Sequence, residues 1–132
     1  MIIMIMGCHN PSRGTKGLQG LQSRNALGTL SDLELDVTGD DSIACAAQKI
    51  TNDFGVIDLL VNNAGIALAR SQDRSSELRE ILHTNSVGPV VLTEVLLPLL
   101  KNPKTPESLT FPRVWARSPS SRIRTGAVML AL

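Results

Sequence analysis

Tyrosine is missing from this chain, and aromatic residues make up only 2% of its 132 residues. No tyrosine can therefore donate or accept a proton anywhere in these 132 residues. The two cysteines, Cys8 and Cys45, do not have the spacing of a metal-binding cluster, so we expect no metal site. We expect both cysteines to be reduced and buried, as is typical of a cytoplasmic protein.

Long hydrophobic runs are missing too. No run approaches the roughly 18 apolar residues of a membrane span, and we expect no membrane partner. The apolar start, residues 1–6, is short, has no positively charged leader and is followed by Gly7, Asn10 and Pro11. These features argue against a signal peptide.

Charge is nearly balanced, with a formal net charge of +1, but it is unevenly distributed. Residues 101–132 hold six of the 13 basic residues and, in Glu107, one of the 12 acidic residues. A basic tail can indicate an anionic partner. No interleaved aromatic residues or nucleic-acid motif accompany it, so we interpret it as a solvated tail and expect no nucleic-acid partner.

The remaining composition, 42% hydrophobic and 19% charged, suits one domain with a packed core. Apolar runs and alternating patterns predict strands, and apolar residues at helical spacing predict helices. The predicted strands are residues 1–6, 30–37 and 56–61, and the predicted helices are residues 12–25, about 41–54 and 75–100. This order predicts an α/β fold with a partial Rossmann-type, doubly wound parallel sheet.

Asp36 and Val37 stand at the end of the second predicted strand. Ligands of open parallel sheets bind at the carboxyl ends of the strands. A carboxylate there can accept a hydrogen bond from an adenine amino group. The alternative is a plain turn or helix cap, since Asp-Val-Thr-Gly-Asp also suits a turn.

The third predicted strand is followed by Asn62, Asn63, Ala64 and Gly65. The small residues allow a backbone to pass close to a planar ligand, while the amide side chains can brace neighbouring strands. An ordinary Asn/Gly turn is the alternative. The position after a buried strand, together with Asp36, favours a binding site.

Pro89 interrupts the long predicted helix and cannot donate the backbone hydrogen bond to the residue four positions earlier, Asn85. The Asn85 carbonyl is then available within a long helix, and it can hold an ordered water. A tolerated kink at Gly88 and Pro89 is the alternative.

Five segments together resemble the short-chain dehydrogenase/reductase family, and its NADP-dependent, carbonyl-reductase-like members in particular. They are GCHNPSRG from residue 7, LELDVTGDDSI from 33, DFGVIDLLVNNAGIAL from 53, LHTNSVGPVVLTEVLLPLLK from 82 and PRV from 112. The resemblance covers roughly residues 5–114. It implies an incomplete NAD(P)-binding, Rossmann-like domain over residues 1–114 and an irregular basic tail over residues 115–132.

The resemblance also implies roles for residues on the adenosine side. Asp36 would contact the adenine, with the Val37 backbone beside it. Asn63, Ala64 and Gly65 would line the adenosine and its ribose. The cofactor would be NADP.

Three further residues acquire implied roles. Asn85 would be the active-site asparagine, whose carbonyl holds a water of a proton relay. His9 and Arg13 lie where such enzymes recognise the 2′-phosphate of NADP, although His9 stands where this subgroup usually has arginine.

The amino-terminal part departs from the family, because no glycine-rich phosphate-binding turn is present. Residues 1–6 resemble the second strand of the family, and the family's first strand lies between its second and fourth. Without that strand, its neighbours would expose unpaired backbone groups or pair abnormally. Alternatively, residues 1–6 are the first strand, and Asp36 resembles the acid that binds the ribose.

The catalytic end departs further. The family requires a serine, and then a tyrosine and a lysine four residues apart. This chain has no tyrosine, and Ser118 lies only near the position of the family's serine. The change to an unpatterned basic tail leads us to expect a truncated or frame-shifted product, inactive in hydride transfer.

Intact relatives would transfer hydride between NADP(H) and a small carbonyl or alcohol substrate. A non-catalytic role is the alternative for this chain. Residues 75–100 would then bind a full-length homologue or a second copy through their apolar face.

Overall fold

The computed structural model describes residues 2–23, 28–67, 73–100, 108–110 and 128–131. The main elements are β1 (Ile3–Cys8), α1 (Pro11–Gln22), β2 (Thr29–Glu34), α2 (Asp40–Asp53), β3 (Leu59–Asn62), α3 (Arg74–Leu82), α4 (Gly88–Leu96), β4 (Ser108–Thr110) and β5 (Val128–Ala131). Every strand and helix predicted within the first hundred residues is present, with ends shifted by a few residues. None of the described helices is long and apolar enough to cross a membrane.

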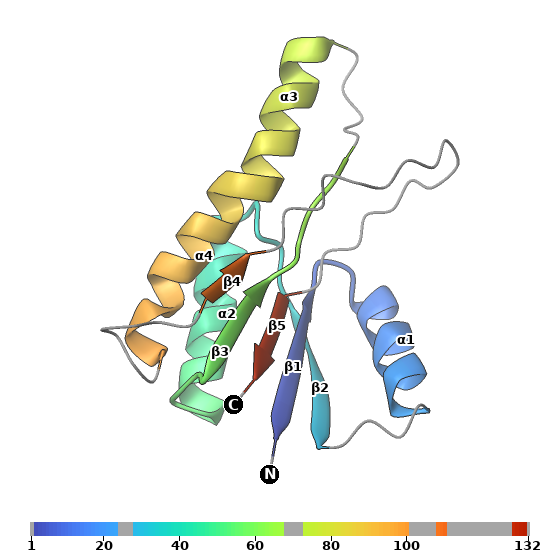
Figure 1. The fold of residues 1–132 in the computed structure, drawn as a ribbon, viewed down its shortest axis with the longest axis vertical. Helices are drawn as coiled ribbons and strands as arrows, with labels where there is room; N and C mark the ends of the chain where they lie inside the picture. The colour runs from blue at the N-terminus through green and yellow to red at the C-terminus, as the bar shows by residue number, and fades with distance from the viewer. Residues whose placement is uncertain (1, 24–27, 68–72, 101–107, 111–127, 132) are drawn as a thin grey trace.

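The strands form one sheet in the order β2-β1-β5-β3-β4 (Figure 1). β1 pairs with β2 in parallel, as β3 does with β4. β5 is antiparallel to both of its neighbours, β1 and β3. The α/β class is confirmed, but the sheet is mixed because a strand from the end of the chain occupies its centre.

Helices cover both faces of the sheet, as a doubly wound arrangement requires. Gly17 of α1 lies against Met6 of β1. The adjacent residue of β1, Ile5, belongs instead to the core cluster that contains Ile43 of α2 and Leu92 of α4. Successive side chains of a strand point to opposite faces, so α1 lies on one face and α2 and α4 lie on the other.

Helix α1 begins where its sequence predicts. The Asn10 side chain accepts a hydrogen bond from the Arg13 backbone N–H at 3.1 Å, and Pro11 occupies the first helical turn. Glycines weaken a helix, but two of them have a packing role here. A Cβ at Gly14 or Gly17 would come within 3.3 Å of Cys8 or Met6, so these glycines let α1 approach β1 closely.

The main core lies between the sheet and the α2–α4 layer. Leu60 of β3 and Leu92 and Leu96 of α4 have no exposed surface. The helix predicted over about 41–54 is present as α2, and its Ile43 and Ile50 are among the most deeply buried side chains. Both cysteines are free, but Cys8 is only half-buried and Cys45 is exposed, which differs from our expectation of two buried thiols.

The long predicted helix is divided rather than simply kinked. Between α3 and α4 the chain makes a π-helical turn, His83–Val87, and α4 ends in a 3₁₀ turn, Leu97–Leu99. The Gly88 N–H donates to the carbonyl of His83, five residues earlier. Pro89 has no N–H, and the wider turn directly before it accommodates the missing bond.

The carboxyl-terminal segment differs from the irregular tail predicted for residues 115–132. Residues 128–131 form β5, and the rest of that segment lies outside the described residues. The resemblance implied a missing strand between the family's second and fourth strands, and β5 occupies the corresponding place between β1 and β3. In the alternative alignment β1 and β3 would be neighbours, so this order favours the first interpretation.

Candidate functional site

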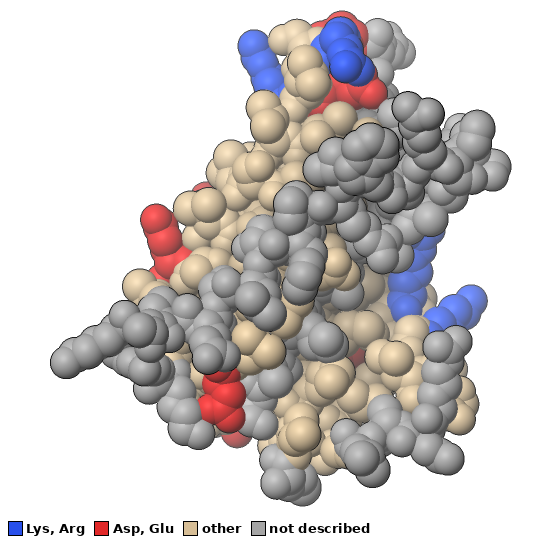
Figure 2. Space-filling view, in the orientation of Figure 1, with Lys and Arg blue, Asp and Glu red and all other residues tan. Residues whose placement is uncertain are grey.

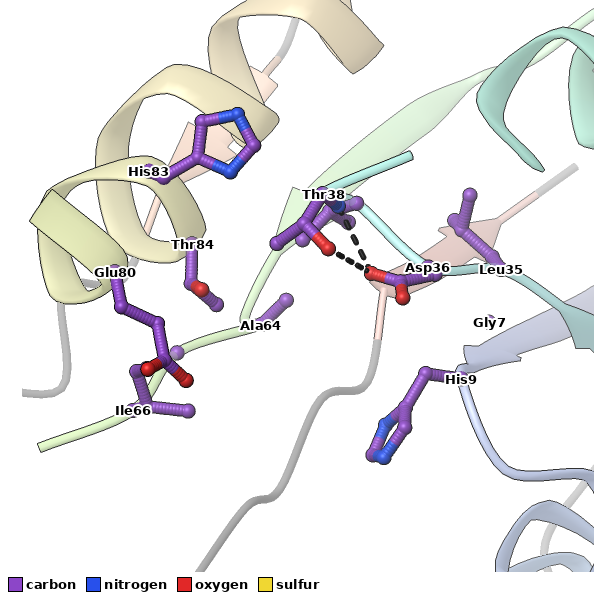
Figure 3. A pocket seen from close by; sticks show the side chains of 12 residues that line it. Gly7, His9, Leu35, Asp36, Thr38, Ala64, Ile66, Glu80, His83 and Thr84 are labelled. Carbon is purple, nitrogen blue, oxygen red and sulfur yellow. Dashed lines mark hydrogen bonds between the residues drawn. The ribbon is translucent and has the colours of Figure 1, made fainter. Parts of the chain in front are cut away.

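A crevice opens at the carboxyl ends of β1, β2 and β3, where ligands of such sheets bind (Figure 3). Its volume is about 270 Å³, just below the range of about 300–1,000 Å³ that is typical of small-molecule sites. The residues that line it are Gly7, His9, Leu35, Asp36, Val37, Thr38, Ala64, Gly65, Ile66, Glu80, His83 and Thr84.

Five of the residues selected from the sequence meet in this crevice. They are His9, Asp36, Val37, Ala64 and Gly65. They come from three separate strand ends, and His9 and Asp36 lie on one side of Ala64 in Figure 3.

Three other selected residues do not line the crevice, and a fourth is outside the described residues. Asn63 directly precedes the lining residue Ala64, Arg13 lies in the first turn of α1, and Asn85 binds the lining residue Ile66. Ser118 falls in the segment that the structure does not describe.

Asp36 forms a local turn at the end of β2. One of its carboxylate oxygens accepts hydrogen bonds from the Thr38 backbone N–H at 2.9 Å and from the Thr38 hydroxyl at 2.7 Å (Figure 3). The turn that we considered as an alternative is therefore real, and the same residue also lines the crevice. The two roles are compatible, because the Thr38 bonds fix the carboxylate in place beside the crevice.

Asn85 holds the loop that follows β3. Its side-chain oxygen accepts a hydrogen bond from the Ile66 N–H, and its side-chain nitrogen donates to the Ile66 carbonyl, both at 2.8 Å. A Cβ at Gly65 would lie 3.3 Å from the Asn85 oxygen, so glycine lets the loop approach Asn85. Asn85 thus positions a wall of the crevice from behind.

Gly88 brings α4 against the end of β2. A Cβ at Gly88 would clash with the Val37 carbonyl oxygen, so the backbone would have to shift. The side of the crevice formed by Asp36 and Val37 therefore rests directly on the first residue of α4.

A second polar bridge joins the end of β3 to α4. The buried Asn62 side chain donates to the Thr93 hydroxyl at 3.0 Å, and that hydroxyl donates to the Pro89 carbonyl at 2.7 Å. The first asparagine of the Asn-Asn-Ala-Gly segment thereby anchors β3 to α4, and the bracing of neighbouring strands by these amides stays a prediction.

α3 and the π-helical turn supply a further wall, whose residues were not among the predicted site residues. Glu80, His83 and Thr84 line the crevice, and in Figure 3 Glu80 and Thr84 lie on the opposite side of Ala64 from His9 and Asp36. Positions three and four apart share one helical face. That spacing within the predicted helix was the available signal, but it does not show which way the face points.

Charge is mixed on the face of the molecule shown in Figure 2. Acidic and basic side chains gather at the end where α3 begins, where Arg74 and Glu77 form an ion pair at 2.9 Å. No continuous basic area appears among the described residues on that face. Within the part of the chain that the structure describes, no three metal-ligating side chains cluster.

The fold and the crevice define a class, a doubly wound α/β domain with a crevice at its strand ends. The sequence identifies the family: residues 5–107 match the family model described as short chain dehydrogenase. The chain belongs to the short-chain dehydrogenase family.

Curated relatives support this assignment. A short-chain dehydrogenase of Penicillium roqueforti, anuI, is 40% identical over 80 residues, which are 58% of this chain and 31% of that protein. A short-chain dehydrogenase/reductase of Aspergillus fumigatus is 32% identical over 108 residues, which are 78% of this chain and 41% of that protein. The chain thus spans less than half the length of these relatives.

Solved structures agree. NADPH-bound carbonyl reductase from chicken fatty liver matches with a TM-score of 0.59 and 31% identity, over 70% of this chain and 38% of that one. A 7α-hydroxysteroid dehydrogenase in complex with NADH matches with the same TM-score of 0.59 over 72% of this chain and 37% of that one. Its identity is 19%, so it shows the fold alone.

Proposed function

We propose that the crevice binds the adenosine half of NADP, as part of an oxidoreductase site for carbonyl or alcohol substrates. The observation that carries the proposal is the meeting of Asp36 and Val37 with Ala64 and Gly65 around one crevice at the strand ends. Asp36 offers an acceptor for the adenine amino group. The small residues of the loop leave room for a flat ring beside the backbone.

NADP is preferred over NAD in this proposal for two reasons. The chicken carbonyl reductase, which is 31% identical, is described as NADPH-bound. In this chain His9 lines the crevice directly after β1, and Arg13 lies in the first turn of α1. Side chains with N–H donors at a helix N-terminus suit a phosphate.

When bound, NADPH would supply the hydride and NADP⁺ would accept it in the reaction of the family. We propose that Asn63 supports the loop around the ribose and that the Asn85 carbonyl holds a water of the proton relay. These 132 residues contain no tyrosine, and we place no catalytic role on Ser118. Loss of a proton-transfer group lowers a rate by about 10²–10⁴-fold. We therefore propose that this chain alone does not turn over carbonyl substrates at a useful rate.

Calorimetric titration with NADPH tests the binding proposal. Ala64→Leu places a larger side chain in the wall of the crevice, whereas Ala67→Leu changes an exposed residue three positions later in the same segment. We expect saturable binding to the parent chain, at least tenfold weaker binding to A64L, and unchanged binding to A67L. No binding to the parent, or equal binding to all three chains, would refute the proposal.

NADPH oxidation with a panel of aldehydes and ketones tests the proposed lack of turnover. We expect no turnover above the background rate for the parent chain. A turnover comparable to that of ordinary enzymes would overturn the proposed inactivity while leaving the binding proposal intact.

A second candidate function is association through α3 and α4. Large apolar side chains on this helical segment are exposed: Leu78 by 44%, Leu82 by 58% and Val90 by 56%. Such a surface favours a protein partner, and we propose a second copy or a longer homologue of the family.

The free cysteines Cys8 and Cys45 fit a reducing compartment such as the cytoplasm.

The test is co-purification with a longer homologue, compared between the parent chain and Leu82→Lys. A stable heteromer that this substitution disrupts would support the second candidate. Monomeric behaviour of the parent at high concentration, without capture of the homologue, would exclude it.

A further inference from the structure

The centre of the sheet contains a slot for one strand. β1 and β3 run in the same direction, and β5 lies between them (Figure 1). Leu130 pairs with Ile5 on one side and with Leu60 on the other, and Met129 pairs with Met6 and Val61. All four residues of β5 are thus paired on both sides.

The slot requires an occupant. Its walls are among the most buried parts of the chain, with Ile5 exposed by 2%, Leu60 by 0% and Val61 by 9%. Without a strand between them, β1 and β3 would leave rows of backbone N–H and C=O groups without partners in the protein interior. Such groups are rarely left unpaired, because each costs free energy comparable to a lost hydrogen bond.

The slot holds its occupant through backbone pairing on both sides. The backbone of β5 forms a ladder with β1 on one side and with β3 on the other, over all four of its residues. Backbone pairing does not depend on which residues the strand contains. An extended segment supplied by another polypeptide could therefore form the same bonds, as in strand addition.

The segment that precedes β5 is long enough for β5 to come from another molecule. β4 pairs on the far side of β3, and residues 111–127 join it to β5. Seventeen residues can span at most about 60 Å. This reach is enough for the strand's own slot and also for the slot of a neighbouring copy. Exchange of an identical element between two copies preserves every backbone bond and adds little cost.

We propose that the β1–β3 slot is a strand-binding site that accepts the segment Val128–Ala131 of a second copy, giving a strand-exchanged dimer. Each copy then completes the sheet of the other. The first residue of β5, Val128, pairs with Gly7, which lines the crevice. The strand of the partner therefore enters at the edge of the ligand site.

Cysteine pairing tests the proposal on the full chain. In a background with Cys8→Ser and Cys45→Ser, one chain carries Met6→Cys and the other Met129→Cys, since these positions face each other directly. The two chains are mixed in denaturant, refolded together at several concentrations and oxidised. We expect a disulfide-linked heterodimer whose yield rises with concentration.

A matched pair out of register provides the control. Met4 pairs with Ala131, so Met4→Cys mixed with Met129→Cys is offset by two residues. We expect this pair to yield at least fivefold less heterodimer. Equal yields from both pairs would overturn the proposal.

A single chain that carries both M6C and M129C reports on the slot itself. At low concentration we expect an intrachain disulfide. If it forms but no interchain product appears at any concentration, exchange is refuted. If neither product forms, the slot is not filled by this segment and the proposal fails as well.

Backbone dependence gives an independent test by sedimentation. Met129→Pro removes an N–H from the middle of β5, whereas Met129→Ala keeps it. We expect the parent and M129A to dimerise alike and M129P to remain monomeric at the same concentration. A dimer that survives in M129P would refute the exchange and would point instead to the α3–α4 surface.

Discussion

Asn85 and Ile66 form a reciprocal pair, in which one carboxamide binds both the N–H and the C=O of one backbone residue, each at 2.8 Å. Alanine at position 85 removes both bonds. We expect Asn85→Ala to destabilise the chain by about 1–3 kcal/mol, because part-buried backbone groups lose their partners. Urea unfolding measures the change, with the exposed neighbour Ser86→Ala as the control. Equal stabilities of the two variants would show that the Asn85–Ile66 pair does not stabilise the fold.

Gly88 allows a contact that no other residue permits, since its missing Cβ leaves room for the Val37 carbonyl. We expect Gly88→Ala to lower the free energy of unfolding by about 1–3 kcal/mol through steric crowding. Gly20→Ala is the matched control, because a Cβ there meets nothing within 4 Å. Position 20 lies inside α1, so alanine should stabilise the chain there by up to about 1 kcal/mol. The prediction fails if both substitutions change stability in the same direction.

Thr93 joins Asn62 to the Pro89 carbonyl through its hydroxyl. Valine has nearly the same shape but no hydroxyl, so Thr93→Val should destabilise by about 1–3 kcal/mol. Thr51 makes a similar bond to the Ala47 carbonyl at 2.8 Å, but on an exposed surface. Thr51→Val should therefore be nearly neutral. Thermal and urea unfolding measure the free energy of unfolding of both variants. Equal losses of stability in Thr93→Val and Thr51→Val would contradict this interpretation.

Leu92 is fully buried, whereas Val90 on the same helix is 56% exposed. Leu92→Ala should cost about 2–5 kcal/mol through lost burial and a residual cavity. Val90→Ala should stay within about 0.5 kcal/mol, as is usual for exposed positions. The two unfolding midpoints provide the comparison. A large effect at Val90 would instead indicate that this face is covered by a partner.

His9 lines the crevice where the proposed 2′-phosphate would lie. Arginine always carries a positive charge and can bind a phosphate through two parallel N–H donors. We expect His9→Arg to bind NADPH about tenfold more tightly, a gain of about 1.4 kcal/mol. Its affinity for NADH, which lacks that phosphate, should not change. Calorimetric titration with both cofactors measures the two affinities. An equal gain in affinity for NADPH and NADH would show that the 2′-phosphate does not cause the tighter binding.

The local order of strands and helices was predictable because short-range patterns determine it. An alternating apolar pattern predicted the strand observed as β2, and apolar residues at helical spacing predicted the helix observed as α2. The sequence pattern also located the interruption near Pro89. It did not show that the interruption would take the form of a π-helical turn, which depends on how the helix packs on both sides of the proline.

For the site, the sequence by itself determined that Asp36, Ala64 and Gly65 would meet, because the ends of parallel strands share one edge of the sheet. Only the tertiary structure decided that Glu80 and Thr84 close the opposite wall, since the direction of a helical face is set by packing. The tertiary structure also decided what fills the centre of the sheet. The sequence of a four-residue apolar segment does not show which distant strands it pairs with. The position of β5 follows from the backbone groups of β1 and β3, which would be unpaired without it.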